Sequence, residues 1–465
     1  MASLAKQYCV RGTVLAAGVF ALLAGGCKGT APSSERDARR DFSSVRAAYR
    51  PGDRPALPAL TTNASLGDFL TYAMLNQPQV EAAWHDWDAS VESITAARSL
   101  PDPQLTFESD IANMVTSIMP GLMENFPGPG KLRAAGDAAA AASRVKYFAF
   151  ESSVLQSAFD LKSAYYDLYF LDAKLGIDRQ TRDLLGDIEK LARSQNEVGK
   201  ATLQDVLRAQ IEQDRTANDI TNLEDSRHLL MAKFKAALGL SAEQPDPPLP
   251  VAFESTPLDL TSDQLFAEAL ARNPRLRGMA AEVRSAEASL RVAYKERTPD
   301  FTAGIQADVK ASPVFYRPQL AMSLPIWRDK LAADLAAAQA NKRAAEARLS
   351  AEQINLAVDF AEKSFQFRES SRNLDLLQNQ LLPKAQLSLA VARSAYLSGQ
   401  QEFVNLIDAE RALLDIQLSE VEARVQREQA LADLSLLILG QPPVNAPILS
   451  RAAESASATK TPATR

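Results

Sequence analysis

The chain of 465 residues carries an internal duplication, and a repeat of this length constrains the architecture more than any single motif does. Residues 69–78 resemble residues 265–274, and further matches follow in the same order along both halves. They pair Pro101-Asp102 with Pro299-Asp300, Phe126-Pro127 with Leu324-Pro325, Arg193-Ser194 and Gly199 with Arg393-Ser394 and Gly399, and Leu238-Gly239 with Leu439-Gly440. Because the offset between partners drifts only from 196 to 201 residues, we expect two similar copies of one unit.

Each copy should be mainly helical. An amphipathic helix is expected over roughly 65–99 and 262–297, interrupted by an Asn/Gln-Pro step and ended by a proline-marked break. A very long helix should follow residue 329, since no proline occurs before Pro383, which should kink it because proline lacks the amide. Spacings of three and four predict one packed seam along that helix, formed by Leu331, Leu335, Ala338, Lys342, Ala345, Leu349, Glu352, Leu356 and Asp359.

Between the opening helix and the long helix, apolar residues recur at every second position instead of at spacings of three and four. In residues 301–310, Phe301, Ala303 and Ile305 alternate with polar or small residues. Weaker alternation occurs in residues 105–110, and partner strands are expected near 120–127 and 318–327. Each copy is therefore predicted to contribute one two-stranded hairpin, at about 103–127 and 300–327, with one apolar face and one polar face.

Four amphipathic strands from one chain cannot close a barrel, and open strand edges are not tolerated in lipid. Outer-membrane barrels use even strand numbers from eight upward, and eight strands are largely filled by side chains. We therefore expect a symmetric oligomer, most simply a trimer. The expected fold class is mainly α with a small β part, in which a trimeric α-helical tunnel carries a shared twelve-stranded transmembrane β-barrel.

The N-terminus has the pattern of a secretory signal. Lys6 and Arg11 precede an apolar stretch, and Ala24-Gly25-Gly26-Cys27 follows it. A cysteine directly after small residues is the bacterial lipoprotein pattern, so residues 1–26 are predicted to be removed and Cys27 to be acylated. Removal of Cys9 with the signal leaves Cys27 as the one mature cysteine, for which acylation supplies a reason. The alternative is ordinary cleavage, with Cys27 incidental.

Composition sets the remaining boundaries and excludes several functions. The expected divisions are a lipidated, extended linker at 27–65, the first unit at 66–244, a linker at 245–261, the second unit at 262–440 and a disordered tail at 441–465.

Two cysteines and two histidines without ligand spacing argue against a zinc site, so neither metal nor cofactor is expected. A net charge of −6 without a basic block argues against nucleic acid. No nucleophile–base pair emerges, and an enzyme is the least favoured class.

The duplicated helix–hairpin–long-helix plan, the Asn-Pro openings and the Arg-Ser…Gly turns resemble the TolC-type outer membrane efflux proteins over about residues 66–440. The resemblance implies a homotrimer in outer membrane lipid that serves as a passive exit duct. It also implies a periplasmic adaptor protein and an inner-membrane pump, of the RND type. Residues 126–131 and 324–330 are more similar to the heavy-metal and cation-efflux branch.

The same resemblance implies that the turns near Gly199 and Gly399 form the periplasmic end of the tunnel. In the family these tips contact the adaptor, and the matching residues here are Arg193, Val198, Gly199, Thr202, Arg393, Ser398 and Gly399. An alternative stays open: each glycine supplies a left-handed helix cap, and each arginine favours the end of a helix.

A gate is implied next to these turns. Tyr396 falls at the family's gating tyrosine, and Asp205 and Asp408 fall at aspartates that form rings around the trimer axis, which would attract cations. Asn405 stands where the family often has a second aspartate, and Gln401 where an arginine can help to lock the gate. The selectivity ring should then be weaker. Alternatively, Asp408 is an exposed helix carboxylate near Arg411.

Two other functions compete with the efflux duct. One is the same duct serving type I protein secretion. The other is a lipid-anchored periplasmic coiled-coil scaffold without a pore. The predicted hairpins favour a duct, because a scaffold has no need of strands with one apolar face at equivalent points in both copies.

Overall fold

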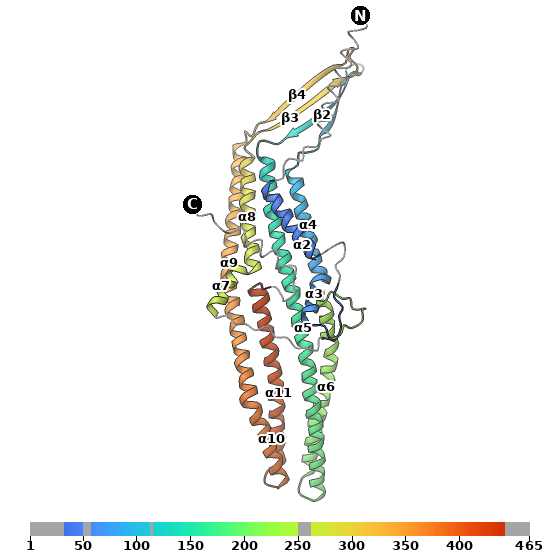
Figure 1. Cartoon of the computed structure of the whole chain (residues 1–465), viewed down its shortest axis with the longest axis vertical. Helices are drawn as coiled ribbons and strands as arrows, with labels where there is room; N and C mark the ends of the chain where they lie inside the picture. The colour runs from blue at the N-terminus through green and yellow to red at the C-terminus, as the bar shows by residue number, and fades with distance from the viewer. Residues whose placement is uncertain (1–31, 50–56, 112–114, 250–261, 442–465) are drawn as a thin grey trace.

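The computed structural model describes residues 32–49, 57–111, 115–249 and 262–441. The predicted signal peptide, Cys27 and nearly all of the predicted tail lie outside these residues. The described chain is an elongated helical rod with a β-sheet at one end and two helical turns at the other (Figure 1). None of its helices is both long enough and apolar enough to cross a membrane.

The expected order of elements is confirmed in both copies. The first copy consists of α3 (Leu66–Asn76), α4 (Pro78–Arg98), β1 (Gln104–Ile111), β2 (Val115–Phe126), α5 (Lys131–Glu197) and α6 (Leu203–Ala237). The second copy consists of α7 (Ser262–Arg272), α8 (Pro274–Lys295), β3 (Asp300–Asp308), β4 (Phe315–Ser323), α9 (Arg328–Leu376), η1 (Leu377–Leu381), α10 (Leu382–Leu397), α11 (Phe403–Ala432) and η2 (Asp433–Ile438). The fold class is therefore mainly α with a small β part, built from a duplicated unit.

The long helices differ between the copies. Helix α5 runs for 67 residues without interruption, which corresponds to about 100 Å. The equivalent helix of the second copy is divided by the five-residue π-helical segment η1, directly before Pro383. The hydrogen-bond pattern of the helix therefore changes just before Pro383, where the sequence predicts a kink. The seam predicted along α9 is also present, since all nine of its residues are buried or half-buried.

In each copy, the Asn/Gln-Pro motif near the start of the unit contacts the segment around the Leu-Gly motif at its end. Asn76 Nδ2 donates hydrogen bonds to the carbonyl oxygens of Leu238 and Gly239, at 2.9 and 3.1 Å. Gln77 Nε2 donates to the carbonyl oxygens of Ala236 and Ala237 at 3.0 and 3.5 Å, and Asn273 makes the equivalent clamp on those of Leu437 and Ile438, both at 3.0 Å. The residue before each proline therefore satisfies carbonyl groups that the end of a helical segment leaves unpaired. This contact explains why the opening motif and the Leu-Gly motif recur together.

The four strands form one antiparallel sheet in the order β1-β2-β3-β4. The hairpins of the two copies are joined through β2 and β3, where Leu122 pairs with Ile305. Leu105 and Leu320, from the outer strands, share the apolar face with this pair, and both are exposed in the single chain. The prediction of one two-faced hairpin per copy is confirmed.

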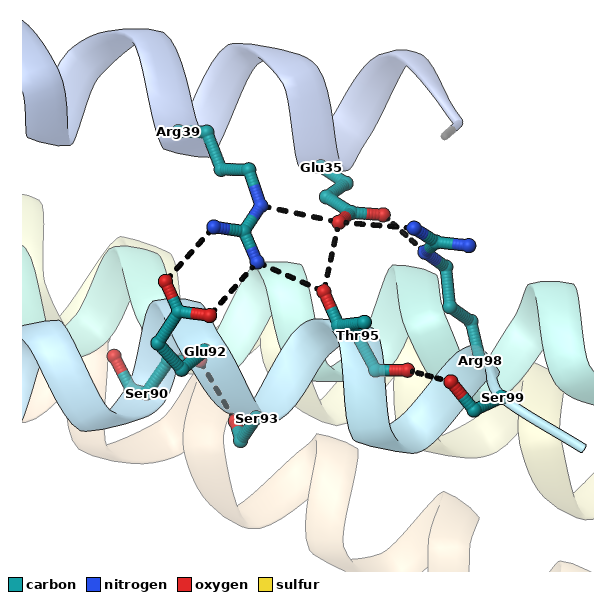
Figure 2. Close-up of polar contacts among 8 residues, drawn as sticks. All are labelled: Glu35, Arg39, Ser90, Glu92, Ser93, Thr95, Arg98 and Ser99. Carbon is teal, nitrogen blue, oxygen red and sulfur yellow. Dashed lines mark hydrogen bonds and ion pairs between the residues drawn. The ribbon is translucent and has the colours of Figure 1, made fainter. Parts of the chain in front are cut away.

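One expectation about the N-terminal linker is wrong. Residues 33–49 do not form an extended strap but the helix α2 (Ser33–Tyr49), which lies along α4 and α5 (Figure 1). The side chain of Phe42 stacks on Trp84, with 4.5 Å between ring centroids. Glu35 is only 2% exposed and pairs with Arg39 and Arg98 (Figure 2). Tertiary packing therefore overrides a Ser- and Arg-rich composition.

Candidate functional site

Both candidate tips are built around a glycine in the left-handed conformation. Gly199 has φ +74° and Gly399 has φ +76°. The amide of Lys200 donates to the carbonyl of Gln195 at 2.8 Å, and the amide of Gln400 donates to the carbonyl of Ala395 at 2.9 Å, which is the hydrogen-bond pattern of a Schellman cap. A Cβ atom at either glycine would meet nothing within 4 Å. The backbone conformation, and not crowding within the chain, thus calls for glycine at both tips.

The first tip continues into a capped helix. The carboxylate of Asp205 accepts hydrogen bonds from the amide and the hydroxyl of Thr202, both at 2.9 Å, and the Thr202 hydroxyl accepts one from the amide of Asp205. This is a capping box, which satisfies amides at the start of α6. Val198 is 65% exposed, and Arg193 is also exposed and pairs with Glu189. The predicted contact residues of this tip are thus open to a partner.

The second tip has the same turn without the capping box. Glu402 precedes α11 but makes no side-chain cap, and Asn405 is exposed. Ser398 donates its hydroxyl hydrogen to the carbonyl of Ala395 at 3.0 Å, and Arg393 is exposed. The two tips therefore share a backbone but differ in the chemistry at positions 205 and 405.

Tyr396 lies between the two hairpins, one formed by α5 and α6 and the other by α10 and α11. Its ring packs on Phe403 with 5.4 Å between centroids. Its hydroxyl has no hydrogen-bond partner, and burial together with the charge of Asp205 raises the pKa of Tyr396. The buried cluster around it draws on all four helices and includes Leu185, Ile188, Ala192, Val206, Ala209, Ala392, Leu406 and Ile407.

A groove of about 830 Å³ separates the two turns and brings several predicted residues together. Thr202, Asp205, Tyr396, Ser398 and Gly399 all line it. Asp408 and Asn405 do not belong to this lining.

Asp408 instead projects from α11. Its side chain is 63% exposed, and one oxygen lies 3.9 Å from Arg411. This matches the alternative interpretation, an exposed helix carboxylate near Arg411. Within one chain, the predicted gate residues therefore divide into Tyr396 and Asp205, which are buried and half-buried and line the groove, and an exposed pair on α11.

An ion pair that joins α6 and α11 near the tips was not predicted from the sequence. Arg411 of α11 donates from Nε to a carboxylate oxygen of Glu212 of α6 at 3.1 Å, and its Nη2 bonds the other oxygen. Next to Arg411, Glu410 is 2% exposed. The duplication offered a hint of this pair, because positions 212 and 411 differ by 199 and the offset between the copies ranges from 196 to 201 residues.

The described residues offer no arrangement for a resident metal ion. Among them, no group of three or more His, Cys, Asp or Glu side chains is placed to hold one. The residues near the tips are hydrogen-bonding, ionic and apolar groups that can hold helices together or release them.

Comparison with known proteins gives matches in family and in fold. A family model described as "Outer membrane efflux protein" matches residues 70–240 and 265–440. No sequence among the curated proteins matches the chain significantly.

Three solved structures illustrate the likeness in fold. A membrane protein from Pseudomonas aeruginosa is similar with a TM-score of 0.73 at 17% identity, over 86% of this chain and 99% of that one. CusC gives 0.71 at 17% identity, over 85% and 99%. VceC from Vibrio cholerae gives 0.68 at 16% identity, over 81% and 96%. At these identities the likeness shows a shared fold.

Proposed function

The chain belongs to the outer membrane efflux protein family, the outer membrane channels of tripartite efflux systems, and we propose that it works as a homotrimeric exit duct with a gate at the tips. The observation that carries the proposal is the four-stranded sheet at the end of the rod opposite the tips (Figure 1). A scaffold without a pore has no use for it.

The sheet supports a shared barrel. Within the described chain, β1 and β4 each pair on one side only, so both ends of the sheet keep a free edge. Such edges are resolved by pairing with another chain or by closure, and three four-stranded sheets supply twelve strands. The apolar face, which carries Leu105, Phe107 and Leu320, would then meet lipid.

Unpartnered apolar residues on the helices support the same assembly. Leu203, Leu207 and Ile211 follow one another at intervals of four along α6, and all three are exposed. On α9, Ile354 and Val358 are also exposed at an interval of four. Such stripes lie on one face of a helix and are the kind of surface that a neighbouring helix covers. Neighbouring copies in a closed helical tunnel would supply those helices.

We propose that the two tips serve as the contact for a periplasmic adaptor protein and as the gate. The exposed Arg193, Val198, Thr202, Arg393 and Ser398 would face the adaptor. The buried cluster around Tyr396, which draws on α5, α6, α10 and α11, would hold the two helical hairpins close together and so keep the entrance narrow. An inner-membrane pump of the RND type would supply the driving force. Metal cations and small molecules are the proposed cargo.

Acylation of Cys27 belongs to the same proposal, because it would attach the chain to the membrane that holds the sheet. The Cys27→Ala variant should lose acyl modification and globomycin sensitivity. A variant that still runs as an acylated, globomycin-sensitive species would remove the lipoprotein assignment.

Conductance in planar bilayers tests the duct. The purified trimer should conduct, and Tyr396→Ala should raise the conductance because it removes a ring from the cluster between the hairpins. Val198→Trp should impair export without changing the yield of trimer, whereas Gly199→Trp would confound contact with backbone strain. Absence of conductance in both wild type and Tyr396→Ala would favour the scaffold.

A further inference from the structure

The two helical hairpins are joined by an ion pair above the buried cluster of the tips. Arg411 of α11 pairs with Glu212 of α6, whose carboxylate also accepts a hydrogen bond from Arg215 at 3.1 Å. Glu212 is mostly buried, so little water competes for its carboxylate. The hydrogen bond from Arg411 is the largest influence on this group and keeps the pKa of Glu212 low. Glu212 is therefore ionised at any physiological pH.

Glu410 lies directly before Arg411 on α11, and its side chain is almost completely buried. The charged groups that act on it are Glu212 from α6 and Arg411 and Asp415 from its own helix. The side chains of α5 and α10 that pack on the preceding turn of α11 are apolar members of the buried cluster, among them Leu185 and Ala392. Burial first, and the charge of Glu212 second, raise the pKa of Glu410 to about 7.

We propose that Glu410, Glu212 and Arg411 form a proton-sensitive clasp, which holds the two hairpins together while Glu410 carries a proton and loosens when the proton leaves. The inference rests on the proposed gate only for its physiological role, because the clasp itself lies within one chain. It assigns a positioning role to a residue that touches neither cargo nor adaptor.

The direction follows from proton linkage. The packed hairpins hold the proton of Glu410 more tightly than separated hairpins would, since separation returns the carboxyl group to water. Below about pH 4.5 Glu410 is neutral in both arrangements and does not favour separation. Between that value and about pH 7 a solvated Glu410 ionises, whereas the packed arrangement must keep the proton or hold a buried charge under the influence of Glu212, so separation becomes more favourable until the pH passes about 7. The hairpins should therefore separate more readily at pH 8.5 than at pH 6.

The test measures the distance between the two tips directly. Spin labels at Val198→Cys and Leu397→Cys report on one exposed position in each hairpin. Labelled chains are diluted among unlabelled ones, so that distances within one chain dominate. Between pH 6 and pH 8.5 the population with separated tips should grow, by at most about tenfold per pH unit for one proton.

Two variants and one control complete the experiment. Glu410→Gln imitates the protonated group and should keep the tips packed at both pH values. Arg411→Gln removes the ionic partner and should raise the separated population at both, with unchanged helical circular dichroism as the check on folding. Glu422→Gln removes one carboxylate from an exposed position of the same helix and should behave like wild type.

The outcomes separate the clasp from the duct. A wild-type distance that does not depend on pH, or a Glu410→Gln variant that responds to pH as wild type does, overturns the clasp. A chain with the expected change in tip distance but no conductance at any pH leaves the clasp in place and overturns the duct. A trimer that conducts but whose tip distance does not depend on pH leaves the duct in place and overturns the clasp.

Discussion

Replacing Asn273 by alanine should loosen the junction at which the second copy closes on itself. The Asn273 side chain donates to the carbonyl oxygens of Leu437 and Ile438 and accepts from the amide of Leu276 at 3.0 Å, and the residue is only 3% exposed. A buried carbonyl group without a donor costs about 1–3 kcal/mol, and loss of a side-chain N-cap costs about 1 kcal/mol. The variant should therefore lose about 2–4 kcal/mol of local stability.

Hydrogen exchange followed by mass spectrometry measures this loss where it occurs. Peptides that cover residues 433–441 should exchange about 30- to 1000-fold faster in Asn273→Ala than in wild type, since 1.4 kcal/mol corresponds to a factor of ten. Peptides from the distant tips should be unchanged. Equal exchange in the variant and in wild type would contradict the argument.

Two further variants separate the clamp from the cap. Asn273→Asp keeps an oxygen for the amide of Leu276 but sets a carboxylate against two carbonyl oxygens, so it should not restore protection. If it does, the N-cap alone explains the effect and the clamp is refuted. Gln77→Ala removes the equivalent clamp from a half-buried residue that makes no side-chain N-cap, so it should cost only about 1 kcal/mol.

Three shorter predictions concern other parts of the chain. Gly199→Ala and Gly399→Ala should each lower the stability of a tip by about 1–2 kcal/mol, measured by hydrogen exchange of the turn, because a left-handed backbone penalises a Cβ even in open space. Burial raises the pKa of Glu35, but hydrogen bonds from its arginine partners outweigh burial and lower it, so the stability that the carboxylate adds is lost as pH falls through that lowered value. Glu35→Gln should therefore release α2 already at neutral pH, seen as a red shift of tryptophan emission. Asn405→Asp should raise the cation preference of the conducting trimer and Asp408→Asn should lower it; an unchanged preference in both would remove these positions from the ion path.

The sequence predicted elements whose signal is local. Period-two alternation around Ile305 and the lack of proline after residue 329 are visible within short windows, and both predictions are confirmed. Helix α2 escaped prediction because its stability depends on distant partners: Arg98 for Glu35 and Trp84 for Phe42. No property of residues 33–49 alone reveals those contacts.

The candidate site was predictable in position but not in mechanism. The glycine turns fix where the tips are, whereas the burial of Tyr396 depends on how four helices meet. The pair of Glu212 with Arg411 joins helices from different copies, so it required the register between two hairpins.

Equivalence between the copies also shows where the chemistry of the two tips differs. At the first tip the carboxylate of Asp205 accepts two hydrogen bonds from Thr202, so the group that faces Tyr396 is fixed by the start of its own helix. At the second tip neither Glu402 nor Asn405 closes such a box, and Asn405 carries no charge. The two tips therefore share one backbone turn but differ in their polar groups, because only the first tip has a carboxylate that its own helix cap holds in place.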